Sequence, residues 1–234
     1  STLTIQPGAI IDAREYAIIV NGTLVATDAD FISTVTGSSS SHGAGLWTGI
    51  IGNQNSQITL DRVSISGAET ALLNYGDASV SLSSLQDVYI GIDNHGDLTL
   101  SNTSILASDV YGIRNQGNME VHFANISNSS VGLINTGQLS VYDTQIGNSA
   151  VGFDLDSGTA SLQRISTTGM LVGIASQEGA NVDVYSWIGT DLALALDLSN
   201  SDNFSLEYAV VDGSRFVYAT SLQSSSIVDS TFTG

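Results

Sequence analysis

The segments ALLNYGDASVSL (71–82), IGIDNHGDLTL (90–100), YGIRNQGNMEV (111–121) and VGLINTGQLSV (131–141) repeat one pattern four times. Each contains an asparagine, then any residue, then a glycine, and then apolar residues at alternate positions. The asparagines recur at intervals of 20, 21 and 20 residues, as Asn74, Asn94, Asn115 and Asn135. A repeat this short cannot bury its own apolar face and must stack on its neighbours. The sequence therefore predicts a solenoid.

The spacing of apolar residues inside each repeat indicates strands. In the segment 97–105 the expected inward residues alternate with polar ones around a single bend, and they are Leu98, Leu100, Thr103 and Ile105. No segment shows the longer apolar period of an amphipathic helix with capping residues. Short strands joined by three corners in about 20 residues describe one rung of a parallel β-helix. We predict an all-β chain of about ten rungs, each of 20–21 residues.

The asparagine column has a physical explanation in such a fold. Asparagines at one corner of successive rungs can pass side-chain hydrogen bonds along the stack, each worth about 1 kcal/mol net. The glycine two residues later is expected to take the positive φ of a tight corner. A polar ligand-binding stripe is the alternative interpretation of the column. We favour an internal ladder, because the asparagines keep step with the fold and not with any acid or base.

Composition excludes several classes of partner. The 234 residues include 23 acidic residues against five arginines, no lysine and no cysteine, and the net charge is −18. No basic patch can be assembled, so we expect no binding to nucleic acid or to anionic membranes. No stretch is apolar enough to insert into a membrane. The start at Ser1 suggests a processed form or an excised segment.

The first 50 residues resemble a known family. The stretch LTIQPGAIIDAREYAIIVNGTLVATDADFIST (3–34), followed by GLWTGI (45–50), is similar to the first rungs of right-handed β-helix domains in large bacterial secreted and cell-surface proteins. The Asn-x-Gly rungs extend the likeness to the wider pectate-lyase-like superfamily. The resemblance implies a right-handed parallel β-helix and an extracellular or cell-surface location. It implies no single activity, because such rods serve as adhesin shafts, passenger domains and polysaccharide-cleaving enzymes.

The chain is predicted to form one domain over 1–234. Opening rungs occupy 1–50 and include a polar, glycine-rich loop at 36–45, regular rungs follow over 51–160, and later rungs fill 161–234. In the later rungs the asparagine position becomes apolar or small, with Leu155, Ser176 and Leu196 as the expected replacements. The last residues offer no cap for an exposed solenoid end. We therefore expect further rungs, a partner or self-association at the C-terminal rung.

Charged residues supply one candidate active site. Asp93 and Arg114 occupy equivalent positions on neighbouring rungs, and Asp154 and Asp156 share one face at a spacing of two residues. The resemblance implies two chemistries: lyases with a basic catalytic residue aided by Ca²⁺, and hydrolases with clustered carboxylates. We predict no catalytic residue. Asp154, Asp156, Arg114 and Asp93 form the alternative to that prediction.

Other candidates concern ligands and metals. Tyr142 and Tyr185 are expected in one outward column, which together with His95 could form a ligand face for sugars. No residues show the spacing of a metal site, and no cofactor is predicted. Ca²⁺ is the one cation left open, at acidic turns for which solvated side chains are the default interpretation: Asp28 with Asp30, and Asp197 with Asp202 and Asn203.

Together these patterns favour a structural or adhesive rod segment of a secreted or surface-anchored protein, without catalysis of its own. The alternatives are a polysaccharide-acting enzyme, either a lyase or a glycoside hydrolase, and a carbohydrate-binding module on the side face. The expected partners are polysaccharide or another cell-surface protein.

Overall fold

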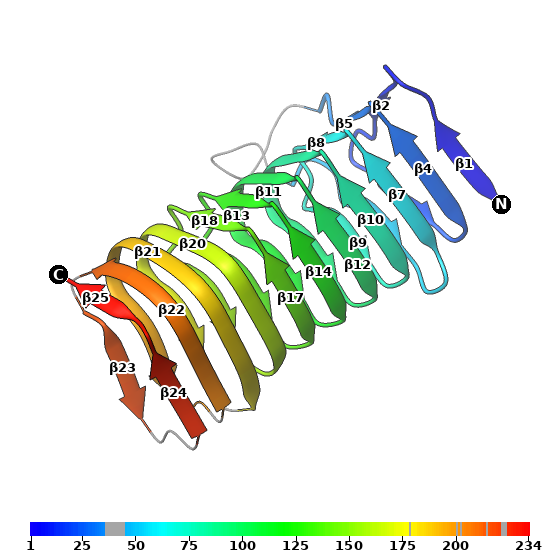
Figure 1. Ribbon diagram of the computed structural model, residues 1–234. Coiled ribbons are helices and arrows are strands. Elements are labelled where there is room, and N and C mark those ends of the chain that lie inside the picture. Colours follow the sequence, from blue (N-terminus) through cyan, green and yellow to red (C-terminus); the bar gives the residue numbers. More distant parts are fainter. Residues whose placement is uncertain (36–44, 178, 200, 202, 214, 221–223) are drawn as a thin grey trace.

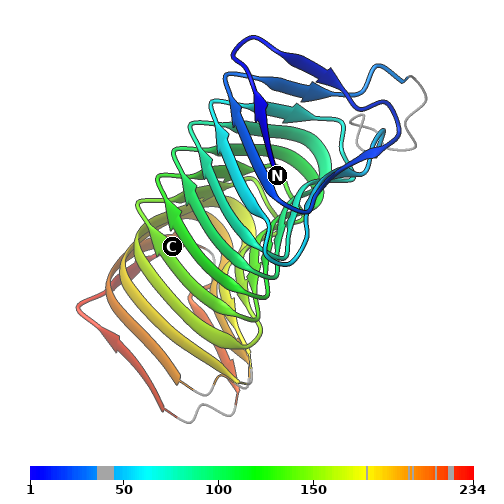
Figure 2. The same ribbon diagram turned by 90° about the vertical axis from the view of Figure 1, so that its right-hand side faces the viewer.

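The computed structural model describes residues 1–35, 45–177, 179–199, 201, 203–213, 215–220 and 224–234. Figure 1 shows a rod in which the chain winds repeatedly around one long axis, with the two termini at opposite ends. Figure 2 shows the same turns stacked behind one another. The described residues contain strands and no helix, so none of their segments is a helix able to cross a membrane. The protein is an all-β parallel solenoid of about ten turns, as the repeats predicted.

Each turn contributes to three faces of the rod, named here in chain order. Face one contains β1 (Thr2–Ile5), β4 (Thr23–Thr27), β7 (Gln57–Asp61), β10 (Asp77–Ser81), β12 (Asp97–Ser101), β14 (Asn118–His122), β17 (Gln138–Tyr142) and β24 (Ser224–Val228). Face two contains β2 (Ile10–Asp12), β5 (Asp30–Ile32), β8 (Ser64–Ser66), β15 (Asn125–Ser127), β18 (Gln145–Gly147) and β25 (Thr231–Thr233). Face three contains β3 (Ala17–Val20), β6 (Gly49–Gly52), β9 (Thr70–Asn74), β16 (Val131–Asn135), β19 (Val151–Leu155) and β23 (Val217–Thr220).

Longer strands bend from one face to the next. They are β11 (Ser84–Asn94), β13 (Ser104–Asn115), β20 (Gly158–Ser176), β21 (Ala180–Ser199) and β22 (Asn203–Gly213). Neighbouring turns pair in parallel, for example β12 with β10 and with β14. Of the polar loop predicted at 36–45, all but Gly45 lies outside the described residues.

The interior is a stack of apolar columns. One column on face one is at most 1% exposed and consists of Val80, Leu100, Val121 and Val141. Another on face two is fully buried and consists of Leu85, Ile105, Ile126 and Ile146. Identical shapes repeated at each turn fill the core continuously, which supplies the apolar burial that stabilises the rod. The inward residues predicted for 97–105 are all buried.

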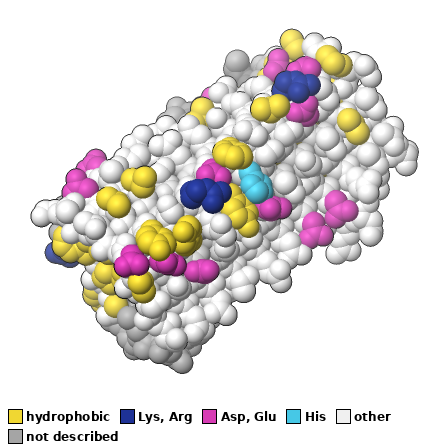
Figure 3. Space-filling view, in the orientation of Figure 1, with side chains coloured by type: hydrophobic (Ala, Val, Ile, Leu, Met, Phe, Trp, Pro, Cys, Tyr) yellow, Lys and Arg dark blue, Asp and Glu magenta, His cyan; other side chains and the backbone are white. Residues whose placement is uncertain are grey.

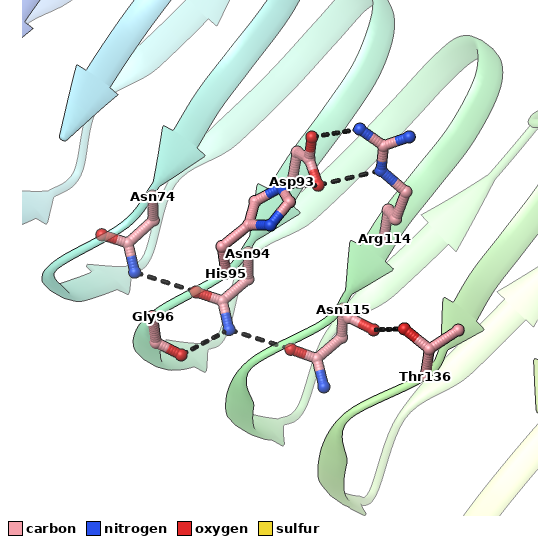
Figure 4. A network of polar contacts seen from close by, with 8 residues as sticks. All are labelled: Asn74, Asp93, Asn94, His95, Gly96, Arg114, Asn115 and Thr136. Carbon is pink, nitrogen blue, oxygen red and sulfur yellow. Dashed lines mark hydrogen bonds and ion pairs between the residues drawn. The ribbon is translucent and has the colours of Figure 1, made fainter. Parts of the chain in front are cut away.

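The asparagine ladder runs along the corner between faces three and one (Figure 4). The Asn74 amide donates to Asn94 Oδ1 at 2.8 Å, Asn94 donates to Asn115 at 2.9 Å, and Asn115 donates to Asn135 at 2.7 Å. All four side chains are fully buried. The internal ladder predicted from the sequence is therefore confirmed.

The glycines beside the ladder have a different role from the predicted one. Gly76, Gly96, Gly117 and Gly137 are not among the residues with positive φ. Instead, a Cβ on Gly117 would lie 2.2 Å from the carbonyl oxygen of Gly96, and one on Gly137 would lie 2.2 Å from that of Gly117. Glycine is required here because successive turns approach too closely for a side chain.

Positive φ occurs at another corner, between faces one and two. One residue per turn adopts it there, including Arg62, Leu82, Asn102, Phe123, Asp143 and Arg164, with φ between 49° and 53°. These residues pair in register from turn to turn, since the strands ahead of them do. Large side chains in this left-handed conformation are unusual and cost free energy.

Beyond Asn135 the ladder position changes as expected, with one correction. Leu155 and Ser176 follow Asn135 in register. The next residue is Leu198 and not Leu196, because Ala175 pairs with Asp197. The corner between Ser176 and Ala180 is longer than the earlier ones, which displaced the prediction by two residues. Ser176 Oγ lies 2.9 Å from Ser201 Oγ, which satisfies this buried hydroxyl after the ladder ends.

Candidate functional site

A long open groove runs along the outside of face one. Its main part has a volume of about 980 Å³, and a shorter part of about 340 Å³ continues it toward the N-terminal turns. Two outward columns form the floor: Asp97, Asn118, Gln138, Thr159, Asn181, Asn203 and Ser224, and Thr99, Glu120, Ser140, Ser161, Asp183, Ser205 and Ser226. The strands alternate inward apolar and outward polar residues, so the floor is a ladder of hydrogen-bonding groups repeated at each turn.

The groove is acidic. Its lining residues include Asp77, Asp97, Glu120 and Asp183, and none of the described lining residues is basic. Asn118 donates to Asp97 Oδ1 at 2.7 Å, which holds that carboxylate against the floor. The charge of the lining disfavours anionic ligands.

Aromatic side chains lie beside the groove, toward face two and two residues along the strands from its floor, although they are not among its lining residues. Tyr142, Gln163 and Tyr185 follow one another in register. The His122 ring stacks on Tyr142, with centroids 4.8 Å apart and planes 11° apart, and Tyr185 meets Tyr208 edge-on at 5.3 Å. Tyr185 is 45% exposed. Figure 3 shows hydrophobic, acidic, arginine and histidine side chains gathered along this side of the groove, beside a mostly uncharged floor.

Sequence reasoning placed the two tyrosines correctly in one column but did not place His122 and Tyr208 beside them. His122 was recoverable, because it pairs in register with Tyr142. Tyr208 was not, because it lies at the corner with a φ of 59°. Its phenol has a pKa raised above the ordinary value, first by a hydrogen bond with Glu207 and then by that residue's charge.

His95 does not share this face with the tyrosines. It follows the ladder residue Asn94 and contacts Asp93, with Nε2 3.2 Å from Oδ1. Its ring stacks on Tyr75 at a centroid distance of 4.7 Å. The three residues predicted for one ligand face therefore lie on two sides of the rod.

Asp93 and Arg114 form the ion pair that their positions indicated (Figure 4). Arg114 donates from Nε to Asp93 Oδ1 at 2.9 Å and from Nη2 to Oδ2, a two-pronged contact with a carboxylate that is almost fully buried. The pKa of Arg114 is raised, mainly by this hydrogen bond. A guanidinium held in this way is protonated and is unsuited to act as a base.

The acid pair lies farther along face three and its corner. Gln177 Nε2 donates to Asp154 Oδ1 at 3.2 Å and to Asp156 Oδ1 at 2.6 Å. Burial is the largest cause that raises the pKa of Asp154 to about 6, followed by the charge of the neighbouring Asp156, with a smaller contribution from Asp197 two turns away. Sequence reasoning missed Gln177, although it occupies the position equivalent to that of Asp156 on the next turn.

None of the four residues in the candidate active site lines the groove. Arg114 and Asp154 lie two turns apart along the same outward column, with Ile134 between them. At about 4.8 Å per turn this separates their backbones by roughly 10 Å. Among the described residues no group of three or more acidic, histidine or cysteine side chains is arranged to hold a metal ion. Asp202, one of the expected Ca²⁺ ligands, lies outside the described residues.

No protein-family model matches the chain, and no curated protein matches its sequence. Two solved structures are similar over the whole chain. Both are the catalytic domain of a GH87 α-1,3-glucanase in complex with nigerose, each with a different aspartate replaced by alanine. One has a TM-score of 0.40 and 10% identity, and the other has 0.35 and 11%. The chain spans 62% of the length of each of these two structures.

Proposed function

We propose that this chain is a rod segment of a secreted or surface-anchored protein that binds an extended neutral polysaccharide along face one without cleaving it. The groove is the observation that carries the proposal. From Gln57 to Ser224 it crosses nine successive turns. At about 4.8 Å per turn it is roughly 40 Å long, which suits a linear polymer better than a compact ligand.

The chemistry of the groove suits a neutral sugar chain. Hydroxyl, amide and carboxylate groups repeat along the floor and can accept and donate hydrogen bonds to sugar hydroxyls. Tyr142 and Tyr185 lie beside the groove, and the apolar face of a sugar ring can pack against the parts of their rings that are exposed. The acidic lining and the lack of a basic lining residue in the described part of the groove disfavour uronate or sulfated chains.

The proposal is tested by affinity electrophoresis and calorimetry against matched neutral and acidic polysaccharides. We expect a neutral polymer to retard the protein, and Tyr142→Ala combined with Tyr185→Ala to weaken binding about thirtyfold, given roughly 1 kcal/mol for each of two stacked rings. Tyr218→Ala is the matched control, because Tyr218 is 54% exposed and lies in β23 on face three, away from the groove. Unchanged binding in the double variant, or no retention by any neutral polymer, would refute the proposal.

A second candidate function is glycoside hydrolysis at Asp154 and Asp156. The raised pKa of Asp154, about 6, favours it, because a general acid must hold a proton near neutral pH. The position of the pair opposes it, because neither carboxyl lines the groove on face one, and the Gln177 amide donates to both of them. Reducing ends released by the wild type and abolished in Asp154→Asn would favour the enzyme over the binding module.

A further inference from the structure

Face three presents a strip of side chains that the groove on face one does not use. Its outward column reads Asp93, Arg114, Ile134 and Asp154 over four consecutive turns, because these residues pair in register. Ile134 lies one turn from Arg114 on one side and one turn from Asp154 on the other. A cation and an anion are therefore placed at equal distances, about 5 Å each along the axis, from an apolar centre.

The surroundings of this centre are also apolar. A second outward column beside Ile134 is half-buried and consists of Tyr111, Val131, Val151 and Val172. Leu171, at the border of this column, is 63% exposed. A flat strip of apolar side chains with charges beyond its centre has the composition of a protein interface.

We propose that face three is the interface of a homodimer in which two rods lie antiparallel about a two-fold axis through Ile134. The axis stacks Ile134 of one copy on Ile134 of the other. It also brings Arg114 of each copy beside Asp154 of the second copy, twice per dimer. An isologous interface requires this kind of self-complementarity, and a column with one cation and one anion equidistant from its centre provides it.

The ion pairing within one chain leaves room for the second carboxylate. Arg114 uses Nε and Nη2 to hold Asp93, and among the described residues Nη1 has no hydrogen-bond partner. Asp154 and Asp156 share the amide of Gln177, and within the described part of the chain no arginine contacts them. A guanidinium from a second copy would supply the cation that this acid pair lacks.

The available area sets the expected strength of the dimer. The outward column from Leu73 to Asp197 crosses six steps between turns, roughly 30 Å, and the five-residue strands of face three are about 16 Å long. About 500 Å² per copy is at the lower limit for a specific interface, so the dimer should dissociate on dilution. Dimerisation leaves face one open, and two grooves on one particle would strengthen attachment to a polymer by avidity.

Sedimentation velocity over a concentration series tests this interface with a charge exchange. Arg114→Asp and Asp154→Arg should each weaken the dimer about tenfold or more, because each sets like charges together twice. The double variant Arg114→Asp with Asp154→Arg restores both opposite pairs and should dimerise again. An equimolar mixture of the two single variants should form mixed dimers for the same reason.

Ile134→Asp provides a test that leaves the Asp93–Arg114 pair intact, and Thr99→Asp on face one adds the same charge away from the interface. Circular dichroism establishes that each variant is folded before its mass is measured. We expect Ile134→Asp to sediment as a monomer and Thr99→Asp to dimerise at the same concentration as the wild type. A wild type that stays monomeric at millimolar concentration would overturn the proposal. So would an Ile134→Asp variant that dimerises normally, or a double variant that remains as monomeric as its parents.

Discussion

Replacing Asn115 by alanine tests whether the ladder stabilises the rod. The Asn115 side chain is fully buried, donates to Asn135 at 2.7 Å, to the Gln138 carbonyl at 2.9 Å and to the Gly117 carbonyl at 3.2 Å, and accepts from Asn94 at 2.9 Å. The side-chain amide has two hydrogens, so these contacts amount to two donated hydrogen bonds and one accepted, and at about 1 kcal/mol each they predict a loss of about 3 kcal/mol in the free energy of unfolding.

The polar groups that contact Asn115 keep other hydrogen-bond partners in Asn115→Ala, which limits the further loss of stability. The Gly117 carbonyl still accepts from the Gln138 amide at 2.8 Å, and the Asn94 amide still donates to the Gly96 and Asn118 carbonyls at 3.0 Å. No strong donor or acceptor is stranded in these contacts, so the loss should follow the number of bonds broken. Asn115→Asp should cost more than alanine, because it buries a charge beside carbonyl oxygens.

Urea unfolding followed by circular dichroism measures these differences. Gln116→Ala is the control, because Gln116 is the exposed neighbour on the same corner, and we expect a change within about 0.5 kcal/mol. If Asn115→Ala loses less than about 1 kcal/mol, or if Asn115→Asp is the milder change, the ladder is not a stabilising network and the reasoning fails.

Three further predictions follow from the backbone and the acid pair. Leu82→Asn should stabilise the protein by about 0.5–1 kcal/mol in thermal unfolding, because Leu82 holds a φ of 51° at a corner where the next turn carries Asn102. Gly117→Ala should cost about 3 kcal/mol or more in urea, since its Cβ would meet a backbone oxygen at 2.2 Å. Folding raises the pKa of Asp154 from 3.8 to about 6, so wild-type stability should fall as pH rises from about 4 to 6. Asp154→Asn should therefore stabilise by about 1 kcal/mol at pH 8, after allowance for solvent screening, and have little effect at pH 4.

The sequence predicted most of the fold because a solenoid repeats its contacts. Once the asparagine interval was known, Asn94 had to lie between Asn74 and Asn115, and Asp93 had to face Arg114. The same logic failed wherever an interval changed. The longer corner between Ser176 and Ala180 moved the expected ladder residue by two positions. The glycine column was recognised, but its cause required the distance between turns, which the repeat pattern does not contain.

The candidate site was less predictable, because it depends on which side chains share a face of the rod and on the shape of that face. The repeat period and the register place Tyr142 in one column with Gln163 and Tyr185. They do not show that His95 lies on another side of the rod. They also do not reveal that face one is hollow, since concavity depends on the corner angles and on the sizes of outward side chains.

The faces on which the candidate residues lie also distinguish polysaccharide binding from glycoside hydrolysis. The acid pair lies outside the groove, where bound polymer would not reach it. A groove of polar rungs with aromatic side chains beside it needs no catalytic group to hold a glycan. Face three is then free to serve another purpose, and its alternation of Arg114, Ile134 and Asp154 is explained by a second copy of the same surface. Binding on one face and self-association on another require only a stiff rod that keeps the two faces apart, and the buried ladder and apolar columns provide that stiffness.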